Sequence, residues 1–303
     1  MVLAGGPNRE HAVSLMSGAQ VSAALSDAGH DVLQRDITPD DLGALDEFVR
    51  WGGHVIFPTL HGSWGEGGAL QFILEEQGIP YIGSNSPVSE VCMDKHRTKL
   101  VLQRYGLATP CFELLSIAQR RSLQLPLVIK APREGSSIDM EICHDESAIR
   151  RARRRLRQRH PELLLERFIP GKELTVGLLG DHPRTIALPP IQIVPAVGYY
   201  DYNAKYLRDD TGYCFDPGEM GLPETVLNQA RELAVKSHDV LGCRHLSRVD
   251  LIVDQDLKLW IIEINTLPGF TSHSLLPMAA AQAGISFAAL TNRLVEMALE
   301  PSS

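Results

Sequence analysis

Two short apolar segments near the C-terminus, residues 248–254 and 259–265, carry acidic side chains at strand spacing and constrain the fold more than any other part of the chain. On the second segment, Glu263 and Asn265 are two residues apart, so a strand would place both on one face. If the segments pair as a hairpin across the intervening turn, Asp250 can come alongside them. The pattern therefore predicts an antiparallel hairpin with three oxygen-bearing side chains close together.

Those three side chains indicate a metal site. Carboxylate and amide oxygens suit Mg²⁺, which takes few protein carboxylates and completes its octahedron with water and nucleotide phosphate. Arg248 lies beside them, and the small-residue loop 268–274 that follows could approach a ligand with bare backbone N–H groups. The alternative is an exposed amphipathic hairpin that carries ordinary surface charges.

The composition is that of a globular protein. The chain has 303 residues, of which 44% are hydrophobic and 22% charged, and this length favours two or three domains. The net charge of −8 argues against a general affinity for nucleic acid or for anionic membranes. A basic run at residues 150–159 is better explained as the solvated face of a helix than as a nucleic-acid patch, because no aromatic residues interleave with it.

The five cysteines indicate a reducing compartment. Their number is odd, they are scattered, and none forms a C-x-x-C pair, which is typical of reduced thiols in a cytoplasmic protein. The N-terminus lacks the apolar core of a signal peptide. No apolar run approaches the roughly 20 residues of a membrane span.

The first ~85 residues alternate strand and helix patterns, which predicts a parallel sheet with helices on both faces. The expected strands are 2–4, 30–37, 55–60 and 80–83, and the expected helices are 13–25, 39–51 and 67–77. In such a sheet, ligands gather at the carboxyl ends of the strands, where Gly5-Gly6 and His61-Gly62 lie.

The rest of the chain reads as α+β. One long helix is expected over 86–105, followed by strands at 112–115, 127–130, 141–144 and 163–169 and a helix at 146–160. From about residue 171 the pattern predicts antiparallel strands, a helix over 225–241, the acidic hairpin and two closing helices. The polar stretch 197–217 is predicted to be a long functional loop.

Several residues suggest a phosphate-binding region. Lys130 ends an apolar strand and is followed by a small-residue loop, an arrangement in which backbone N–H groups and an ammonium can hold phosphate oxygens. The loop is neither a Walker A nor a Rossmann motif, and a plain surface turn is the alternative. Glu166 and Glu173 could accept hydrogen bonds from an adenine amine or ribose hydroxyls. Lys95 is a second candidate for phosphate, with a solvated helical lysine as its alternative.

Taken together, the motifs resemble those of the D-alanine–D-alanine ligases of the ATP-grasp superfamily over nearly the whole chain. The matching stretches are Gly5-Gly6, Glu10-His11-Ala12-Val13-Ser14, Leu60-His61-Gly62, Gly65-Glu66, Met93-Asp94-Lys95, Arg133-Glu134-Gly135-Ser136-Ser137, Tyr200-Asp201-Tyr202-Asn203-Ala204-Lys205-Tyr206, Arg248-x-Asp250 and the run from Glu263 to Ser274. The resemblance implies a three-domain α/β (α+β) fold, with a parallel-sheet N-terminal domain at 1–85 and ATP-grasp subdomains at 86–170 and 171–303.

The resemblance also implies roles at the nucleotide. Lys95, Lys130 and Lys205 would contact the ATP phosphates, Glu173 the ribose, and Glu166 would line the adenine pocket. Two Mg²⁺ ions, for which Mn²⁺ could substitute, would be held by the hairpin: their implied ligands are Asp250, Glu263 and Asn265.

At the substrate end, the resemblance implies that Glu10 holds the ammonium of the first D-alanine. Ser136 and Tyr206 would complete a hydrogen-bonded trio with Glu10 that positions the second substrate. His61 would flank that substrate. The implied oxyanion donors are Arg248 and the N–H of Gly269. The implied carboxylate site for the second D-alanine is Ser274 with the N–H of Leu275.

The expected reaction is ATP-dependent joining of two D-alanines through an acyl phosphate, for peptidoglycan precursors, with the loop 197–217 closing as a lid that excludes water. The resemblance suggests a cytoplasmic homodimer. One alternative is a protein of this fold that has lost catalysis, for which Asp139 in place of the family's usual glycine is the only support. Another is an ATP-grasp ligase for a different carboxylate and amine, against which Glu10, Tyr206 and Ser274 speak.

Tyr206 generates a prediction about the product. In the family that the chain resembles, a tyrosine at this position accompanies amide formation, whereas makers of depsipeptides depart from it. With D-alanine and D-lactate supplied together at neutral pH, we expect mass spectrometry to find mainly D-alanyl-D-alanine. Mainly depsipeptide would overturn this expectation.

Overall fold

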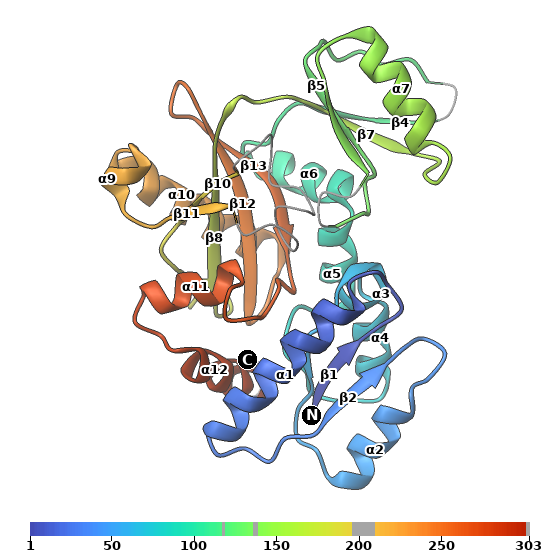
Figure 1. The fold of residues 1–303 in the computed structure, drawn as a ribbon, viewed down its shortest axis with the longest axis vertical. Coiled ribbons are helices and arrows are strands. Elements are labelled where there is room, and N and C mark those ends of the chain that lie inside the picture. Colours follow the sequence, from blue (N-terminus) through green and yellow to red (C-terminus); the bar gives the residue numbers. More distant parts are fainter. Residues whose placement is uncertain (117–118, 136–138, 196–209, 301–303) are drawn as a thin grey trace.

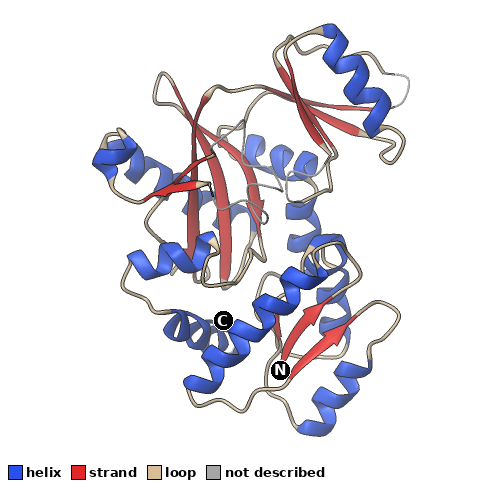
Figure 2. Cartoon of the chain, viewed as in Figure 1, coloured by secondary structure: helices blue, strands red, loops and turns tan. Residues whose placement is uncertain are grey.

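A computed structural model describes residues 1–116, 119–135, 139–195 and 210–300 (Figure 1). Ser136, Lys205 and Tyr206, and with them most of the predicted lid, lie outside the described residues. The described chain forms three sheets with helices packed around them (Figure 2). No helix in these ranges is both long enough and apolar enough to cross a membrane.

The first sheet is parallel, as predicted. Its strands β1 (Val2–Gly5), β2 (Gln34–Ile37) and β3 (Phe57–Pro58) are ordered β2-β1-β3. The surrounding helices are α1 (His11–Asp27), α2 (Gly43–Trp51), α3 (Gly62–Glu66) and α4 (Ala69–Glu76). Helix α3 was not expected, and the strand predicted at 80–83 contributes only an isolated bridge between Ile56 and Tyr81.

The predicted start of α2 at Pro39 was wrong, because a turn precedes the helix. Thr38 and Asp41 form an antiparallel bridge, and Asp41 Oδ1 accepts a hydrogen bond of 3.0 Å from the N–H of Gly43. These contacts satisfy the backbone in a non-helical conformation, so the helix begins only at Gly43.

The single helix expected over 86–105 is two helices, α5 (Ser86–Met93) and α6 (Lys95–Arg104). Asp94 separates them in an extended conformation (φ −89°, ψ 98°), and its side chain accepts hydrogen bonds from the N–H groups of His96 and Arg97. Aspartate is a favourable N-cap, so this residue ends one helix and starts the next. Because of this break between α5 and α6, the side chain of Lys95 is directed towards the sheets that follow in the chain.

The second sheet is antiparallel and four-stranded. Its strands β4 (Phe112–Leu115), β5 (Leu127–Lys130), β6 (Met140–Cys143) and β7 (Leu163–Arg167) are ordered β4-β7-β5-β6. Helix α7 (Glu146–Leu156) packs on it through apolar residues at helical spacing, Ala148, Ile149, Ala152 and Leu156, and leaves most of its arginines towards solvent. The helix ends before the predicted residue 160.

The third sheet is antiparallel, as predicted for the C-terminal part, and has six strands. Its main path is β11-β10-β8-β12-β13, and β9 pairs with β8. The strands are β8 (Gly171–Leu179), β9 (Ile186–Ala187), β10 (Ile191–Val194), β11 (Gly212–Cys214), β12 (Leu246–Asp254) and β13 (Leu259–Asn265). Its helices are α9 (Pro217–Met220), α10 (Glu224–Leu241), α11 (Leu275–Gln282) and α12 (Phe287–Leu299). Strand β11 corrects the prediction that 197–217 is all loop.

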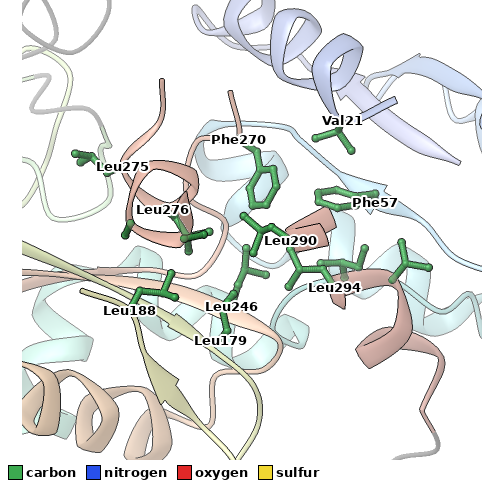
Figure 3. Packing of buried hydrophobic residues seen from close by; sticks show 14 of the residues in the cluster. Val21, Phe57, Leu179, Leu188, Leu246, Phe270, Leu275, Leu276, Leu290 and Leu294 are labelled. Carbon is green, nitrogen blue, oxygen red and sulfur yellow. The ribbon is translucent and has the colours of Figure 1, made fainter. Parts of the chain in front are cut away.

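An apolar cluster joins the first part of the chain to the last (Figure 3). Phe57 of the parallel sheet lies edge-on to Phe270, with ring centroids 5.2 Å apart, and both are buried with Val21, Leu290 and Leu294. These contacts remove large apolar surfaces from water on both sides of the junction. They hold the carboxyl end of the parallel sheet beside the loop that follows β13.

A polar junction reinforces this placement. His245 is buried in a left-handed conformation (φ 61°), and its Nδ1 accepts a hydrogen bond of 3.0 Å from the N–H of Gly83. The adjacent Arg244 donates from Nη2 to the Gly83 carbonyl (3.2 Å) and from its backbone N–H to Ser84 (3.1 Å). Because an accepting imidazole nitrogen must be unprotonated, this contact requires neutral His245.

We predict that acid destabilises the fold through His245. Burial lowers its pKa to about 4, while an unfolded histidine titrates near 6.5. Below about pH 6.5 the unfolded chain therefore binds a proton at His245 that the folded chain does not bind. At pH 5 this lowers the free energy of unfolding by about 2 kcal/mol. Denaturant unfolding at pH 7 and pH 5 measures it.

The matched variant is His245→Asn, which tolerates the left-handed conformation and keeps an acceptor. Its loss of unfolding free energy between pH 7 and 5 should be smaller than the parent's by about 2 kcal/mol. Burial also lowers the pKa of His238. Because His238 is present in both proteins, its contribution to the pH dependence cancels in the comparison. Equal losses in the two proteins would contradict the assignment.

Candidate active site

The β12–β13 hairpin brings the predicted metal ligands together. In the register of the two strands, Asp250 lies opposite Glu263 and Arg248 lies opposite Asn265. Arg248 donates to both oxygens of Asp250, from Nε (2.9 Å) and Nη2 (2.7 Å), and Asn265 Nδ2 donates to the same carboxylate (3.2 Å). Thr175 of β8 adds a hydroxyl donor at 2.6 Å. One carboxylate thus fixes the orientation of three neighbouring side chains.

The second carboxylate is paired with a predicted phosphate ligand. Lys95 Nζ lies 3.3 Å from Glu263 Oε2 and donates to the Glu134 carbonyl at 2.7 Å. The donors fit hydrated Mg²⁺, because two carboxylates and an amide oxygen are hard ligands that leave positions for water and phosphate. The described residues contain no group of three or more His, Cys, Asp or Glu side chains that could enclose a metal ion by themselves.

A cavity of about 240 Å³ lies between the two antiparallel sheets. Every predicted nucleotide contact within the described residues lines it: Lys95, Lys130, Glu166 and Glu173, together with Asp250 and Glu263. Its remaining walls are largely apolar, with Val128, Met140, Ile142, Phe168, Ile169, Leu174, Leu251, Ile252 and Ile262 among them. A largely apolar cavity that is also lined by charged groups suits a planar base that carries phosphates.

A buried ion cluster lies at one wall of this cavity, which Glu166 and Lys130 line. Glu166 Oε1 lies 2.9 Å from Lys130 Nζ and 3.2 Å from Lys99 Nζ. Burial opposes ionisation of Glu166, but the charges of Lys130 and Lys99 outweigh it, so the pKa of the carboxyl lies below its usual value. Lys99 was not predicted from the sequence. The available signal was its position four residues after Lys95, which puts both ammonium groups on one face of a helix.

A second cavity, of about 340 Å³, lies where the parallel sheet meets the loop after β13. The described residues predicted to bind substrate or stabilise the oxyanion all line it: Glu10, His61, Arg248, Gly269, Ser274 and Leu275. Asn265 also borders this cavity. Because Arg248 and Asn265 both contact Asp250, which lines the first cavity, the two cavities meet at this cluster.

His61 lies just after β3 of the parallel sheet and lines the second cavity. Its side chain is buried, and Nδ1 lies 3.3 Å from Glu66 Oε1. Burial opposes the imidazolium, but the Glu66 hydrogen bond and the charges of Glu66 and Glu10 outweigh it and raise the pKa of His61. Within the described ranges Nε2 has no hydrogen-bond partner. A buried ring nitrogen without a partner is suited to contact a bound molecule.

Small residues shape the far wall of the second cavity. Ser274 Oγ accepts a hydrogen bond of 3.0 Å from the Thr271 N–H and lies 2.9 Å from the Thr271 hydroxyl. A Cβ at Gly269 would come within 3.2 Å of Ser274 Oγ, so glycine leaves room for a ligand to approach its backbone N–H. Helix α11 begins at Leu275 immediately after Ser274, so its first N–H groups are free of intrahelical partners.

Comparison with known proteins identifies the chain. Residues 110–296 match the family model for the D-ala D-ala ligase C-terminus. The chain is 43% identical over 301 residues to D-alanine–D-alanine ligase B of Chromobacterium violaceum, covering 97% of this chain and 96% of that protein. This chain belongs to the D-alanine–D-alanine ligase family.

Solved ligase structures confirm the ATP-grasp fold class. A D-alanine–D-alanine ligase from Bacillus anthracis, complexed with ATP, superposes with a TM-score of 0.82 at 29% identity and covers 98% of this chain and 96% of its own. The VanG D-Ala:D-Ser ligase from Enterococcus faecalis superposes with a TM-score of 0.84 at 25% identity, covering 98% of each chain. The boundaries at residues 85 and 170 remain predictions.

Asp139 departs from the glycine expected in this ligase family, and its backbone has the positive φ of 53° that a glycine would adopt easily. His160 Nε2 lies 2.8 Å from its carboxylate, and Arg155 lies 3.4 Å away. Arg155 of α7 supplies a positive charge to Asp139, and the His160 ring contacts the same carboxylate from the turn after the helix.

We predict that Glu66→Gln lowers the pKa of His61. The substitution keeps an oxygen near Nδ1 but removes the negative charge that supports the imidazolium. Titration of the His61 ring by NMR measures the change. The other histidine signals serve as internal controls, and an unchanged or higher pKa for His61 would contradict the assigned cause.

Proposed function

We propose that the chain is an ATP-dependent ligase that joins two D-alanines into D-alanyl-D-alanine, with release of ADP and phosphate, for peptidoglycan precursor synthesis. The observation that carries the proposal is the single cluster of Arg248, Asp250 and Asn265 at which both cavities meet. A reaction that activates a carboxylate with a nucleotide needs that adjacency. Relatives bearing the ligase name cover nearly the whole chain.

In the proposed first step, ATP occupies the 240 Å³ cavity with its base among the apolar walls and its phosphates near Lys95 and Lys130. A carboxylate oxygen of the first D-alanine attacks the γ-phosphorus, the bond to ADP breaks, and D-alanyl phosphate forms. Catalysis of this kind is mostly positioning and charge neutralisation. Two Mg²⁺ ions held by Asp250, Glu263 and Asn265 would supply further neutralising charge.

In the proposed second step, the amine of the other D-alanine attacks the acyl carbon in the 340 Å³ cavity, and phosphate leaves as the amide forms. Glu10 would hold the ammonium of the first D-alanine, with His61 beside it. Arg248 and the Gly269 N–H would donate to the tetrahedral oxyanion; one such donor is typically worth ~3 kcal/mol.

The remaining assignments of the proposal rest on the family. Ser274 and the N–H of Leu275 would receive the carboxylate of the second D-alanine. Ser136 and Tyr206 would complete the trio with Glu10, and Lys205 would contact phosphate from the lid. A cytoplasmic location is supported by free thiols at all five cysteines, and a homodimer is proposed from the resemblance.

The decisive experiment measures phosphate release from ATP and Mg²⁺ with and without D-alanine. We expect D-alanine to stimulate release and mass spectrometry to identify D-alanyl-D-alanine. D-Serine and D-lactate, each supplied with D-alanine, test the second substrate. Release that D-alanine does not stimulate would refute the proposal.

Two substitutions test the cluster where the cavities meet. Arg248→Ala removes a proposed oxyanion donor and Asp250→Asn a proposed metal ligand, so each should lower kcat at least ~100-fold with the fold intact. Asp256→Asn makes the same chemical change in the exposed hairpin turn and should leave kcat near the parental value. Near-parental turnover in either cluster variant would sink its assigned role.

A further inference from the structure

Lys99 is a fully buried lysine that lies behind the nucleotide cavity rather than in its wall. Its residue is 0% exposed in the middle of α6, and it is not among the residues that line the cavity. Its Nζ donates to Thr109 Oγ1 at 2.6 Å and lies 3.2 Å from Glu166 Oε1. Lysine is almost never buried to this extent unless it is paired, and Glu166 is the acidic partner of Lys99.

The Glu166 carboxylate has two cationic neighbours where one would balance its charge. Lys130 and Lys99 both make their nearest approach to the same oxygen, Oε1. Burial lowers the pKa of Lys99 to about 8, partly offset by the charge of Glu166 and reinforced by that of Lys130. The cluster thus carries an excess positive charge close to a cavity suited to an anionic ligand.

The two lysines differ in access. Lys130 ends β5 and lines the cavity, so an incoming phosphate can become its partner. Lys99 cannot reach the cavity and keeps its contact with Glu166. A buried carboxylate that loses its only counter-charge is strongly destabilised, and a second, resident cation prevents this.

Thr109 fixes the direction of the Lys99 ammonium. The Thr109 hydroxyl donates its single hydrogen to the Ile261 carbonyl at 2.8 Å, so its oxygen can only accept from Lys99. Ile261 belongs to β13, the strand that carries Glu263. The chain of contacts therefore ties the carboxylate on β7 to the strand that bears a proposed metal ligand.

We propose that Lys99 is a positioning residue that holds Glu166 ionised and in place, and so frees Lys130 to bind the phosphates of ATP. The inference rests on the proposed function only in that ATP occupies the cavity between the two antiparallel sheets. Lys99 itself touches neither substrate nor nucleotide. Its effect on ATP affinity must therefore pass through Glu166.

A double-mutant cycle tests this dependence. The dissociation constant of ATP with Mg²⁺ is measured by isothermal titration calorimetry, without D-alanine, for the parent, Lys99→Met, Glu166→Gln and the double variant. We expect Lys99→Met to weaken binding at least ~10-fold in the parent and less than ~2-fold in the Glu166→Gln background, since the two residues act as one unit. Lys236→Met, which removes an exposed lysine of α10, should leave the dissociation constant unchanged.

Equal weakening in both backgrounds would show a merely structural role for Lys99 and overturn the proposal, as would unchanged binding in Lys99→Met. If Lys99→Met does not fold, Thr109→Val replaces it, because it keeps the lysine and removes only the group that orients it. We then expect ~3-fold weaker binding, again abolished by Glu166→Gln; equal effects in the two backgrounds would refute the proposal.

The measurement also separates this proposal from the proposed function. A parent protein that binds ATP but does not join D-alanine refutes the ligase activity and leaves the Lys99 cycle interpretable. A parent protein that does not bind ATP refutes both.

Discussion

The bidentate contact between Arg248 and Asp250 is the interaction on which the arrangement of the site depends. It occurs because residues two apart on β12 share a face, and the register of β13 places Glu263 and Asn265 beside it. A slip of one residue between the strands would turn Glu263 and Asn265 to the opposite face. The register is secured by apolar side chains on the other face, including Val249, Leu251 and Ile264. The packing of these apolar side chains therefore determines where the charged side chains of the hairpin come together.

The charged side chains of the site lie beside neighbours of opposite charge within the protein. Lys95 faces Glu263, Arg248 faces Asp250, and two lysines face Glu166. Buried ion pairs offer little net stability against apolar replacements, so their presence here is better explained by ligand binding than by folding. Each cation at a cavity wall can exchange a carboxylate for a phosphate oxygen without passing through an unpaired state.

The sequence was informative where local periodicity determines the structure. Strand spacing predicted the hairpin and the proximity of Asp250 to Glu263, and the βαβ alternation predicted the parallel sheet. The sequence was not sufficient where other contacts determine the structure. The break at Asp94 depends on helix capping by its side chain. The burial of Lys99 depends on strands that lie over 60 residues away in the sequence. The His61–Glu66 pair needed the short helix α3, whose pattern is too brief for periodicity to detect. Ser136, Lys205 and Tyr206 stay predictions because they lie outside the described residues.

The apolar junction between Phe57 and Phe270 has a consequence for biosynthesis. The parallel sheet leaves the ribosome before the C-terminal helices, yet Val21 and Phe57 are covered by residues such as Phe270 and Leu290 that are made more than 200 residues later. Contacts between such distant parts of a chain form late, because a long loop must close before they are gained. During translation the nascent N-terminal part therefore exposes an apolar surface, to which chaperones can bind until α11 and α12 have been synthesised.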